Sequence, residues 1–459
     1  MSKGERSRRR RLHTWSALFR YRPRRARLAV YRQRPTVSLH PPRPVVRRVG
    51  FALALTGALV IAAFPVTRFA TAGTSVGLVQ PLAGTHQLAS PTGSVLHRFA
   101  PTYMTPTTRY TKAQAVSIAR QFDIIAAHRG QFASDLAAMH AANPKVVVLI
   151  YLNGTFLQSA QGTLYPNSDY AHDQQGNKIT STKFGNYLMD ISNPSWTSLV
   201  VHSCETALRA TPTTTYDGCF IDTLGYALLN GSFLSGVPIN PGTGQPWTTQ
   251  QRIAATTSIA AAVRTAIAPK LVMANGLKNG PDYFGKVPSS QLFNGVSAAL
   301  AEVWLRQAQH PVSTFETESV WLQEVDMLAA AGSKGDSVAV TVKIWITATT
   351  AEVDQWHKYA LASFLLGTTG TSYFSFIAST SPAAFTAVDA WDQVDPGTPS
   401  DPFAKVGGVY ERQFSKGWAV VNPTATTGTV TFSRACKTLE GGTVTTLVLA
   451  PDTGDVCTF

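Results

Sequence analysis

Asp222 ends an apolar run that has the length and composition of a β-strand. The run covers residues 216–222, Tyr-Asp-Gly-Cys-Phe-Ile-Asp, and the alternation of a strand places Gly218, Phe220 and Asp222 on one face. A carboxylate on such a face is costly to bury without a role or a partner. Asp is also a good helix N-cap, and spacing alone favours neither interpretation over the other.

Glu302 is the second candidate acid. It lies in Ala-Leu-Ala-Glu-Val-Trp (residues 299–304), which we assign to the end of another strand, although an Ala-rich run could equally be helical with a solvated Glu. If the strand interpretation is correct, Glu302 and Asp222 face each other across a bound sugar. Glycosidic bond hydrolysis requires such a pair: one carboxylate attacks or stabilises the sugar centre, and one acid protonates the leaving oxygen.

Aromatic and hydrogen-bonding side chains cluster at the ends of the other predicted strands. Sugars present apolar C–H faces that stack on rings, and hydroxyl groups that pair with planar polar groups, so this inventory suits a carbohydrate cleft. Each residue taken singly is more often scaffold. The group includes His128, Arg129, Arg306 and Ser375. The residues that we expect to bind substrate are Tyr103, Tyr151, Asn153, Asn275, Trp304, Lys343, Trp345 and Tyr373.

Residues 95–395 alternate strand-like apolar runs with helical patterns, for example helices at 112–121 and 249–267. Eight such β/α units predict an α/β fold of the (β/α)8 TIM-barrel type, whose active site lies at the carboxyl ends of the strands. An open doubly wound sheet is the competitor, but the glycine patterns of Rossmann and P-loop folds are missing. The expected strands are 96–103, 122–127, 145–152, 218–222, 271–275, 295–304, 337–345 and 371–376.

Residues 396–459 change character. They contain short runs rich in Val, Thr and Gly, which predict a small antiparallel all-β domain, and Pro396, Pro399 and Pro402 mark the linker before it. The expected strands are 407–413, 417–422, 428–433 and 443–449.

The positive charge of the chain is confined to its first 48 residues. The whole chain has a formal charge of +14, whereas residues 1–48 contain fifteen Arg, one Lys and one Glu, so the remainder is close to neutral. Residues 49–67 are uncharged and long enough to span a bilayer. A basic cytoplasmic leader before an apolar segment predicts export of the rest of the chain. Because the basic residues stay on the cytoplasmic side, the positive charge does not indicate a nucleic-acid-binding site in the exported part. A disordered basic arm before a buried helix is the alternative.

The pattern leaves open whether this segment is cleaved. Ala70-Thr71-Ala72 fits a signal-peptidase site before Gly73, and residues 73–94 form a linker rich in small polar residues. The protein is then secreted, or it stays anchored at the outer face of the plasma membrane through residues 49–67.

All four cysteines come after the apolar segment, as expected for an exported protein. Three connectivities are possible, and we favour the local one, Cys204 with Cys219 and Cys436 with Cys457, over free thiols. There is no CxxC pattern, and the ten His residues form no HxH or HExxH pattern. We therefore expect no metal and no cofactor.

Three segments together resemble a known family. They are residues 170–179 (YAHDQQGNKI), 187–196 (YLMDISNPSW) and 216–222 (YDGCFID). In this order they resemble the uncharacterised glycosyl-hydrolase-like family fifteen, which is similar to the α-galactosidase and endo-α-polygalactosaminidase superfamily of barrels. The resemblance extends over about residues 96–385. It implies a reaction class but no substrate.

The resemblance also implies residue roles. Asp222 corresponds to the nucleophile and Glu302 to the acid/base, whereas Asp217 has a structural role at the start of its strand. Cys219 departs from the family pattern, in which an aliphatic residue is usual. The segment 418–424 is similar to the β domain that often follows glycosidase barrels.

The leading prediction is therefore an exported or membrane-tethered O-glycosidase that acts on a polysaccharide, retaining if the two acids are close. The rival is a surface carbohydrate-binding barrel without catalytic activity, because fold does not imply function. The rival gains if Glu302 points away from Asp222 and neither Glu316 nor Glu318 replaces it.

Overall fold

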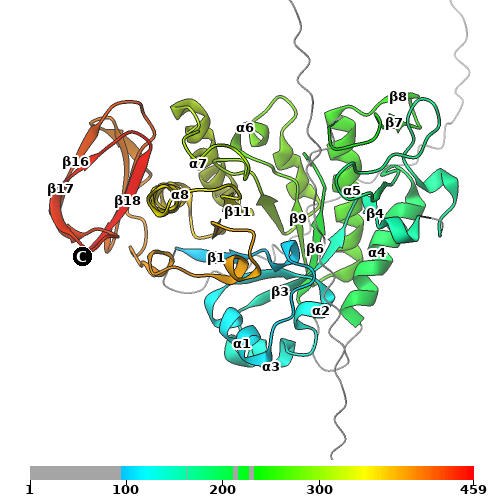
Figure 1. Ribbon diagram of the computed structural model, residues 1–459, viewed down its shortest axis with the longest axis horizontal. Helices are drawn as coiled ribbons and strands as arrows, with labels where there is room; N and C mark the ends of the chain where they lie inside the picture. Colours follow the sequence, from blue (N-terminus) through cyan, green and yellow to red (C-terminus); the bar gives the residue numbers. More distant parts are fainter. Residues whose placement is uncertain (1–94, 163, 210–215, 227–231) are drawn as a thin grey trace, which may run out of the picture. The chain divides into compact units, whose positions relative to one another are not determined.

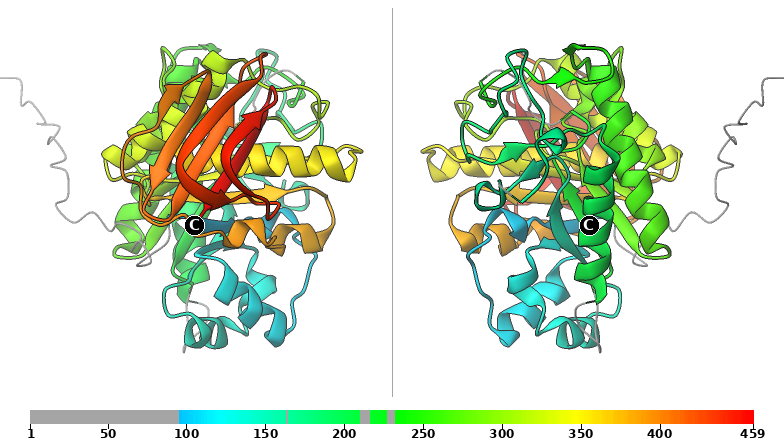
Figure 2. Two further views of the ribbon diagram at one scale, coloured as in Figure 1. Left: turned by 90° about the vertical axis from the view of Figure 1, so that its left-hand side faces the viewer. Right: turned by 90° about the vertical axis from the view of Figure 1, so that its right-hand side faces the viewer.

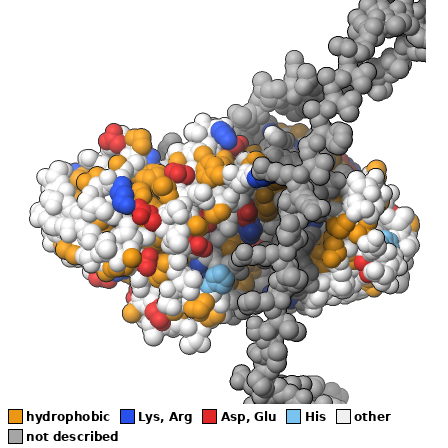
Figure 3. Space-filling model, turned by 90° about the horizontal axis from the view of Figure 1, so that it is seen from above, with side chains coloured by type: hydrophobic (Ala, Val, Ile, Leu, Met, Phe, Trp, Pro, Cys, Tyr) orange, Lys and Arg blue, Asp and Glu red, His pale blue; other side chains and the backbone are white. Residues whose placement is uncertain are grey.

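The computed structural model describes residues 95–459, apart from residue 163 and the segments 210–215 and 227–231. The predicted leader, the apolar segment 49–67 and the linker 73–94 lie outside these residues. In the described part of the chain, no helix combines the length and apolar character needed to cross a bilayer. Acidic and basic side chains are interspersed on the face shown in Figure 3.

Eight parallel strands close into a barrel in the order β1-β12-β11-β10-β9-β6-β3-β2 (Figure 1). The predicted TIM barrel is therefore confirmed. The bounds of β6 and β9 agree with the prediction, whereas β1 is shorter, because residues 102–104 form a 3-10 turn, η1, instead of continuing the strand. The strands are β1 (His97–Ala100), β2 (Ile124–Ala127), β3 (Val147–Asn153), β6 (Gly218–Asp222), β9 (Leu271–Asn275), β10 (Ala298–Ala301), β11 (Ser337–Lys343) and β12 (Ser372–Ile377).

The helices that follow the strands begin at clear sequence signals. Thr111, Thr248 and Thr349 each form a capping box, which satisfies the free N–H groups of the first turn of α1, α5 and α8. The helices are α1 (Lys112–Gln121), α2 (Arg129–Phe132), α3 (Leu136–Ala142), α4 (Pro194–Arg209), α5 (Thr249–Ile267), α6 (Gly280–Tyr283), α7 (Glu318–Ser333) and α8 (Thr350–Gly367). The bounds of α1 and α5 agree with the prediction.

Alternate strand residues fill the barrel interior. Phe220 is fully buried there, on the face that leads to Asp222, and small residues such as Ala298 and Ala339 leave room for the larger rings. Two long connections each add a two-stranded antiparallel sheet: β4 (Phe156–Leu157) pairs with β5 (Tyr187–Leu188) between β3 and α4, and β7 (Ile239–Asn240) pairs with β8 (Gln245–Pro246) between β6 and α5.

The C-terminal part forms a six-stranded antiparallel sheet, as predicted, in the order β13-β14-β15-β18-β16-β17. Strands β15 and β18 pack against α8 (Figure 2). The sequence patterns did not predict β13 and β18. The strands are β13 (Ala404–Val406), β14 (Val409–Phe414), β15 (Gly417–Asn422), β16 (Gly428–Lys437), β17 (Thr443–Leu449) and β18 (Thr453–Thr458).

Both local disulfides are formed, Cys204 with Cys219 and Cys436 with Cys457. The first connects α4 to the strand that ends in Asp222. Cross-links over loops of this length each contribute on the order of 3 kcal/mol by restricting the unfolded chain.

The Arg412 guanidinium fastens the sheet to the barrel. Its Nη1 donates to the carbonyl oxygens of Leu365, Leu366 and Thr368 at 3.1, 2.8 and 2.6 Å, and its Nε donates to the Asp401 carbonyl oxygen. The first three are carbonyls at the end of α8, where no later turn supplies donors and where the helix dipole favours a cation.

We expect Arg412→Met to lower the free energy of unfolding by about 2–4 kcal/mol, because it leaves several buried carbonyls without a donor. Urea denaturation measures this change. Lys437→Met removes an exposed cation from β16 of the same sheet and serves as the control. Equal stability of the two variants would contradict the fastening role of Arg412.

Candidate active site

The two predicted acids lie together at the carboxyl ends of the barrel strands. Asp222 is the last residue of β6 and Glu302 directly follows β10, so the strand interpretation of Ala298–Ala301 is confirmed. Strand β9 lies between them and ends in Asn275. The Asn275 Nδ2 donates to Asp222 Oδ1 at 2.9 Å and to Glu302 Oε2 at 2.5 Å. These two oxygens are therefore no farther apart than the sum of the two distances.

Every oxygen of the two carboxyl groups has a donor. Asp222 Oδ1 also accepts from the backbone N–H of Thr223 at 2.8 Å, and Asp222 Oδ2 accepts from the Tyr151 hydroxyl at 3.0 Å. Glu302 Oε1 accepts from the Lys343 ammonium at 2.5 Å. The side-chain donors come from β3, β9 and β11, which fixes both acids against the barrel.

The electrostatic environments of the two acids differ. Burial, followed by the charge of Glu302, raises the pKa of Asp222 to about 6, against the opposing effect of its hydrogen bonds from Asn275, Tyr151 and Thr223. Burial also acts to raise the pKa of Glu302, but the charge and hydrogen bond of Lys343, with the Asn275 bond and the charge of Lys183, lower it overall. Near neutral pH, Glu302 is thus the ionised member, and a proton held by the pair lies on Asp222.

Aromatic rings form one wall of the site. Tyr103 stacks on Tyr151 with ring centroids 5.2 Å apart, and His128 packs against Tyr151 at 4.4 Å. The Tyr103 hydroxyl is buried without a hydrogen-bond partner within the described residues. Burial, with the charges of Glu302 and Asp222, raises its pKa well above the usual value, so it remains a neutral donor.

Trp345 lies just beyond β11. The Lys343 ammonium sits over its ring, 4.9 Å from the centroid, and the indole nitrogen is buried without a partner in the described part of the chain. Tyr103, Tyr151, Asn275, Lys343 and Trp345 are therefore all connected to the acids by contacts or charge.

Two other predicted residues lie elsewhere, which is a correction. Trp304 is fully buried and donates through Nε1 to the Glu324 carbonyl oxygen of α7, because β10 ends at Ala301 and the chain then turns outward. Tyr373 is the second residue of β12 and pairs with His97 in the register, so it lies at the amino end of the barrel.

Asn153 is close to the acids but holds the backbone. Its Oδ1 accepts from the backbone N–H groups of Thr155 and Phe156 and from the Thr223 hydroxyl, at 3.0, 2.7 and 2.8 Å. It thereby joins the β3 loop to the residue after Asp222. Its place at a strand end was predictable from the sequence, but the direction of its side chain was not.

Other candidate acids are engaged away from the pair. Asp217 Oδ2 accepts from the Val148 backbone at 2.7 Å and contacts His140 Nε2 at 3.0 Å at the start of β6. Glu318 accepts from Lys405 and Tyr410 of the C-terminal sheet. The effect of the Lys183 charge on the pKa of Glu302 was not predicted, because Lys183 lies in the long connection between β4 and β5 and not at the end of a barrel strand.

Three residues with positive φ follow the strands that carry the site. Thr223, Lys278 and Leu305 have φ of 63°, 67° and 61°, within three residues of Asp222, Asn275 and Glu302 respectively. Side-chain-bearing residues in this region are typically strained by about 1–3 kcal/mol, and such strain clusters at functional sites.

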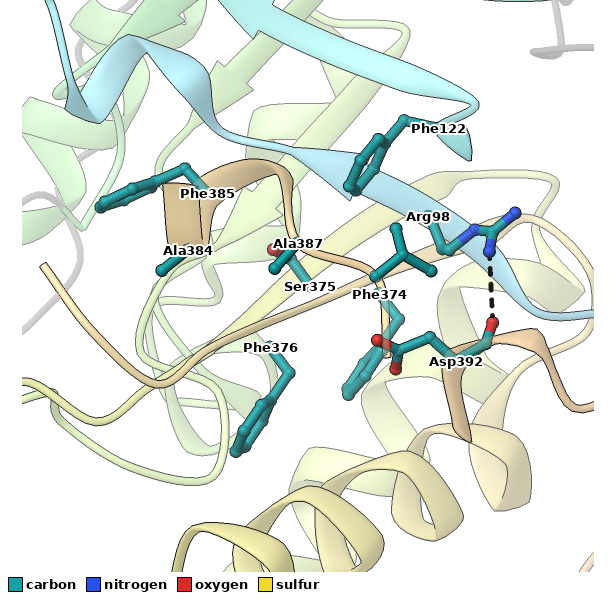
Figure 4. Close-up of a pocket in the computed structure, with 10 residues that line it drawn as sticks. Arg98, Phe122, Phe374, Ser375, Phe376, Ala384, Phe385, Ala387 and Asp392 are labelled. Carbon is teal, nitrogen blue, oxygen red and sulfur yellow. Dashed lines mark hydrogen bonds between the residues drawn. The ribbon is translucent and has the colours of Figure 1, made fainter. Parts of the chain in front are cut away.

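Two cavities differ in their capacity to hold a substrate. The cavity shown in Figure 4 lies among β1, β12 and the segment after β12, where the Arg98 guanidinium donates to the Asp392 carbonyl oxygen at 3.4 Å. Its volume of about 10 Å³ suits little more than one water molecule. The second cavity, of about 280 Å³, adjoins Tyr151 and Asn153 and is large enough for a small ligand.

The sequence profile of hypothetical glycosyl hydrolase family 15 matches residues 140–418, more than half of the chain. The chain belongs to this family. The match supports a glycoside hydrolase, and it begins before β3, so it includes all three strands that carry Asp222, Asn275 and Glu302. A comparison with curated proteins returned no match.

A comparison with solved structures returned distant matches. The noncanonic maltogenic alpha-amylase AmyB from Thermotoga neapolitana is 9% identical, with a TM-score of 0.46 over 80% of this chain and 98% of that chain. Eubacterium rectale Amy13B is 10% identical, with a TM-score of 0.43 over 79% and 94%. The GH31 dextranase FjDex31A from Flavobacterium johnsoniae is 11% identical, with a TM-score of 0.42 over 80% and 52%.

The raised pKa of Asp222 predicts a stability difference between variants. An acid whose pKa is higher in the folded than in the unfolded state favours folding at low pH, and this contribution is lost as the pH rises through the folded value of about 6. We expect Asp222→Asn to increase the free energy of unfolding by about 1–3 kcal/mol at pH 8 and to have little effect at pH 3.5.

Denaturant titrations at both pH values measure this effect. Glu302→Gln is the matched contrast, because a lowered pKa stabilises the folded state above the unfolded value, and its loss is expected to destabilise the protein at pH 8. A destabilised Asp222→Asn variant at pH 8 would contradict the raised pKa of Asp222 in the folded protein.

Proposed function

We propose that the protein is an exported glycoside hydrolase that cleaves O-glycosidic bonds of a polysaccharide with retention of configuration, using Asp222 and Glu302. The observation that carries this proposal is the single amide nitrogen between the two carboxyl groups. Retaining enzymes hold their carboxyl groups about 5–5.5 Å apart, whereas inverting enzymes need about 6.5–9.5 Å to admit a water molecule. The Asn275 amide group that bonds to both acids therefore favours the shorter separation, which is that of retaining enzymes.

The charges favour a division of roles opposite to the one that the family resemblance implies. Glu302 is held as a carboxylate by Lys343, which suits a nucleophile that attacks the anomeric carbon. Asp222 has a pKa of about 6, which suits a general acid that donates a proton to the leaving oxygen. We therefore assign Glu302 as nucleophile and Asp222 as acid/base.

The same interaction would switch Asp222 from acid to base. Formation of the glycosyl ester removes the negative charge of Glu302, and this charge is one cause of the raised pKa of Asp222. The pKa of Asp222 then falls, so that it accepts a proton from the water that attacks the ester. Hydrolysis returns Glu302 to its charged form and Asp222 to its protonated form, with net addition of one water.

Two observations support the location. The two disulfides are typical of an oxidising compartment, and the basic and apolar segments at 1–48 and 49–67 fit an export signal or an anchor. The rival function, a binding protein without catalysis, would gain support if the second acid pointed away from Asp222 and no other acid replaced it. Glu302 instead shares a donor with it.

Variants distinguish the two roles. We expect Glu302→Gln to lose activity on every substrate, because the covalent intermediate cannot form. We expect Asp222→Asn to lose about 10²–10⁴-fold on an oligosaccharide but far less on an aryl glycoside whose leaving group needs no proton. Galactosaminan, galactan and glucan oligomers and the corresponding dinitrophenyl glycosides are the substrates for the assay.

Glu411→Gln, in the C-terminal sheet, is the control and is expected to keep full activity. If Asp222→Asn were inactive on every substrate and Glu302→Gln kept activity on the aryl glycosides, Asp222 would be the nucleophile and Glu302 the acid/base, as the resemblance implies. Full activity of Asp222→Asn or Glu302→Gln on oligosaccharides would remove that residue from the mechanism.

A further inference from the structure

A cavity of about 280 Å³ lies beside the carboxyl end of β3. Its walls come from three places in the chain: the strand ends at the barrel mouth, the connection between β3 and α4, and one face of α4. The lining residues are His128, Tyr151, Leu152, Asn153, Phe156, Leu157, Gln158, Gln161, Tyr165, Trp196, Leu199, Val200 and Ser203.

This cavity shares Tyr151 with the proposed active site. The Tyr151 ring lines the cavity, and its hydroxyl donates to Asp222 Oδ2 at 3.0 Å. Asn153, the next inward residue of β3, also lines the cavity and donates to the Tyr151 hydroxyl at 3.4 Å. A ligand in the cavity therefore contacts a ring whose hydroxyl group bonds to Asp222.

The lining is uncharged. It contains no Asp, Glu, Lys or Arg, and the burial of His128 lowers the pKa of its imidazole, so that this ring is neutral at pH 7. A ligand with an ammonium or carboxylate group would lose hydration here without gaining an ionic partner, which is strongly unfavourable. The cavity thus selects against charge of either sign.

The chemistry of the walls is divided between a deep apolar side and a polar rim. Trp196 and Val200 are buried on the α4 side, and the Trp196 indole N–H is already bonded to the Gly154 oxygen at 2.9 Å, so its ring offers only an apolar surface. Gln158 and Gln161 are exposed at the rim. Apolar faces with a few amides suit a sugar ring and an acetamido group.

We propose that this cavity is a binding site for one uncharged sugar unit of the substrate, adjacent to the unit held at Asp222 and Glu302, and that it accepts an N-acetylated hexosamine but rejects the free amine. This inference rests on the proposed function for the identity of the chain that occupies it. The selection by charge is a property of the cavity itself, and it can be measured without turnover.

The experiment is a calorimetric or NMR titration of the full-length protein with free monosaccharides, which contain no bond to cleave. The matched probes are N-acetylgalactosamine against galactosamine, and galactose against galacturonic acid. At pH 7 we expect the neutral member of each pair to bind at least about tenfold more tightly than the charged one.

Two variants locate the binding. Leu199 is half-buried and lines the cavity from α4. The variant Leu199→Asp therefore puts a negative charge into the lining. We expect this variant to prefer galactosamine over N-acetylgalactosamine, a gain that misfolding cannot produce. Ser198→Asp places the same charge on the exposed face of α4 and is expected to keep the original preference.

Equal binding of charged and neutral sugars to the unaltered protein, or an unchanged preference in Leu199→Asp, would overturn the proposal. These outcomes are independent of catalysis. A protein that binds as described but cleaves none of the oligomers would contradict the proposed function alone, whereas active cleavage with no charge selection would contradict this site alone.

Discussion

The amide group of Asn275 is the contact on which the site depends. It reaches both Asp222 and Glu302 because β9 lies between β6 and β10, and because all three strands end at the same rim of a closed parallel barrel. Barrel closure thus sets the distance between the acids. At this distance two negative charges repel strongly. Neighbouring charges and hydrogen bonds then determine which of the two acids has the higher pKa and keeps its proton.

Lys343 determines which of the two acids is ionised, because it lowers the pKa of Glu302. It is buried, lies at the end of β11, and pairs with Glu302 and not with Asp222. The resulting asymmetry separates the pKa values of two acids that share a donor. Pairs of acids whose environments drive their pKa values apart are the usual arrangement in sites that combine a nucleophile with a proton donor.

This arrangement is unfavourable for folding. Above its raised pKa of about 6, Asp222 carries a buried charge that raises the free energy of the folded state, and left-handed conformations at Thr223, Lys278 and Leu305 raise it as well. Other features offset the cost: the Cys204–Cys219 disulfide connects β6 to α4, and Asn153 bonds both the β3 loop and Thr223. The strand that carries Asp222 is thus linked covalently to α4, and the residue after it is hydrogen-bonded to the β3 loop.

The eight barrel strands could be predicted because parallel strands buried on both faces are continuous apolar runs. The bounds of α5 followed from the helical pattern between two strand-like runs, and the disulfide pairing followed from local spacing. The position of Trp304 could not be predicted, because it depends on β10 ending three residues before the expected bound, whereas the expected strand 371–376 already put Tyr373 near its amino end. A shift of that size moves the Trp304 ring from the mouth of the barrel to the helix layer.

The division of roles between the acids was also beyond the sequence. Lys343 is 41 residues from Glu302, and only the barrel register brings them together. Likewise, β18 contains Gly454 and Asp455 and lacks the apolar alternation of a typical strand, although it pairs with β15 along its whole length. Its pairing comes from the tertiary fold and not from local preference.

Direct identification of the covalent intermediate is the most decisive measurement. A 2-deoxy-2-fluoro glycoside with an activated leaving group slows the breakdown of a glycosyl ester, so that the labelled protein can be digested and mapped by mass spectrometry. We predict a single sugar adduct on the peptide that contains Glu302. An adduct on Asp222, or cleavage with inversion and no adduct on either acid, would contradict the assignment of Glu302 as nucleophile.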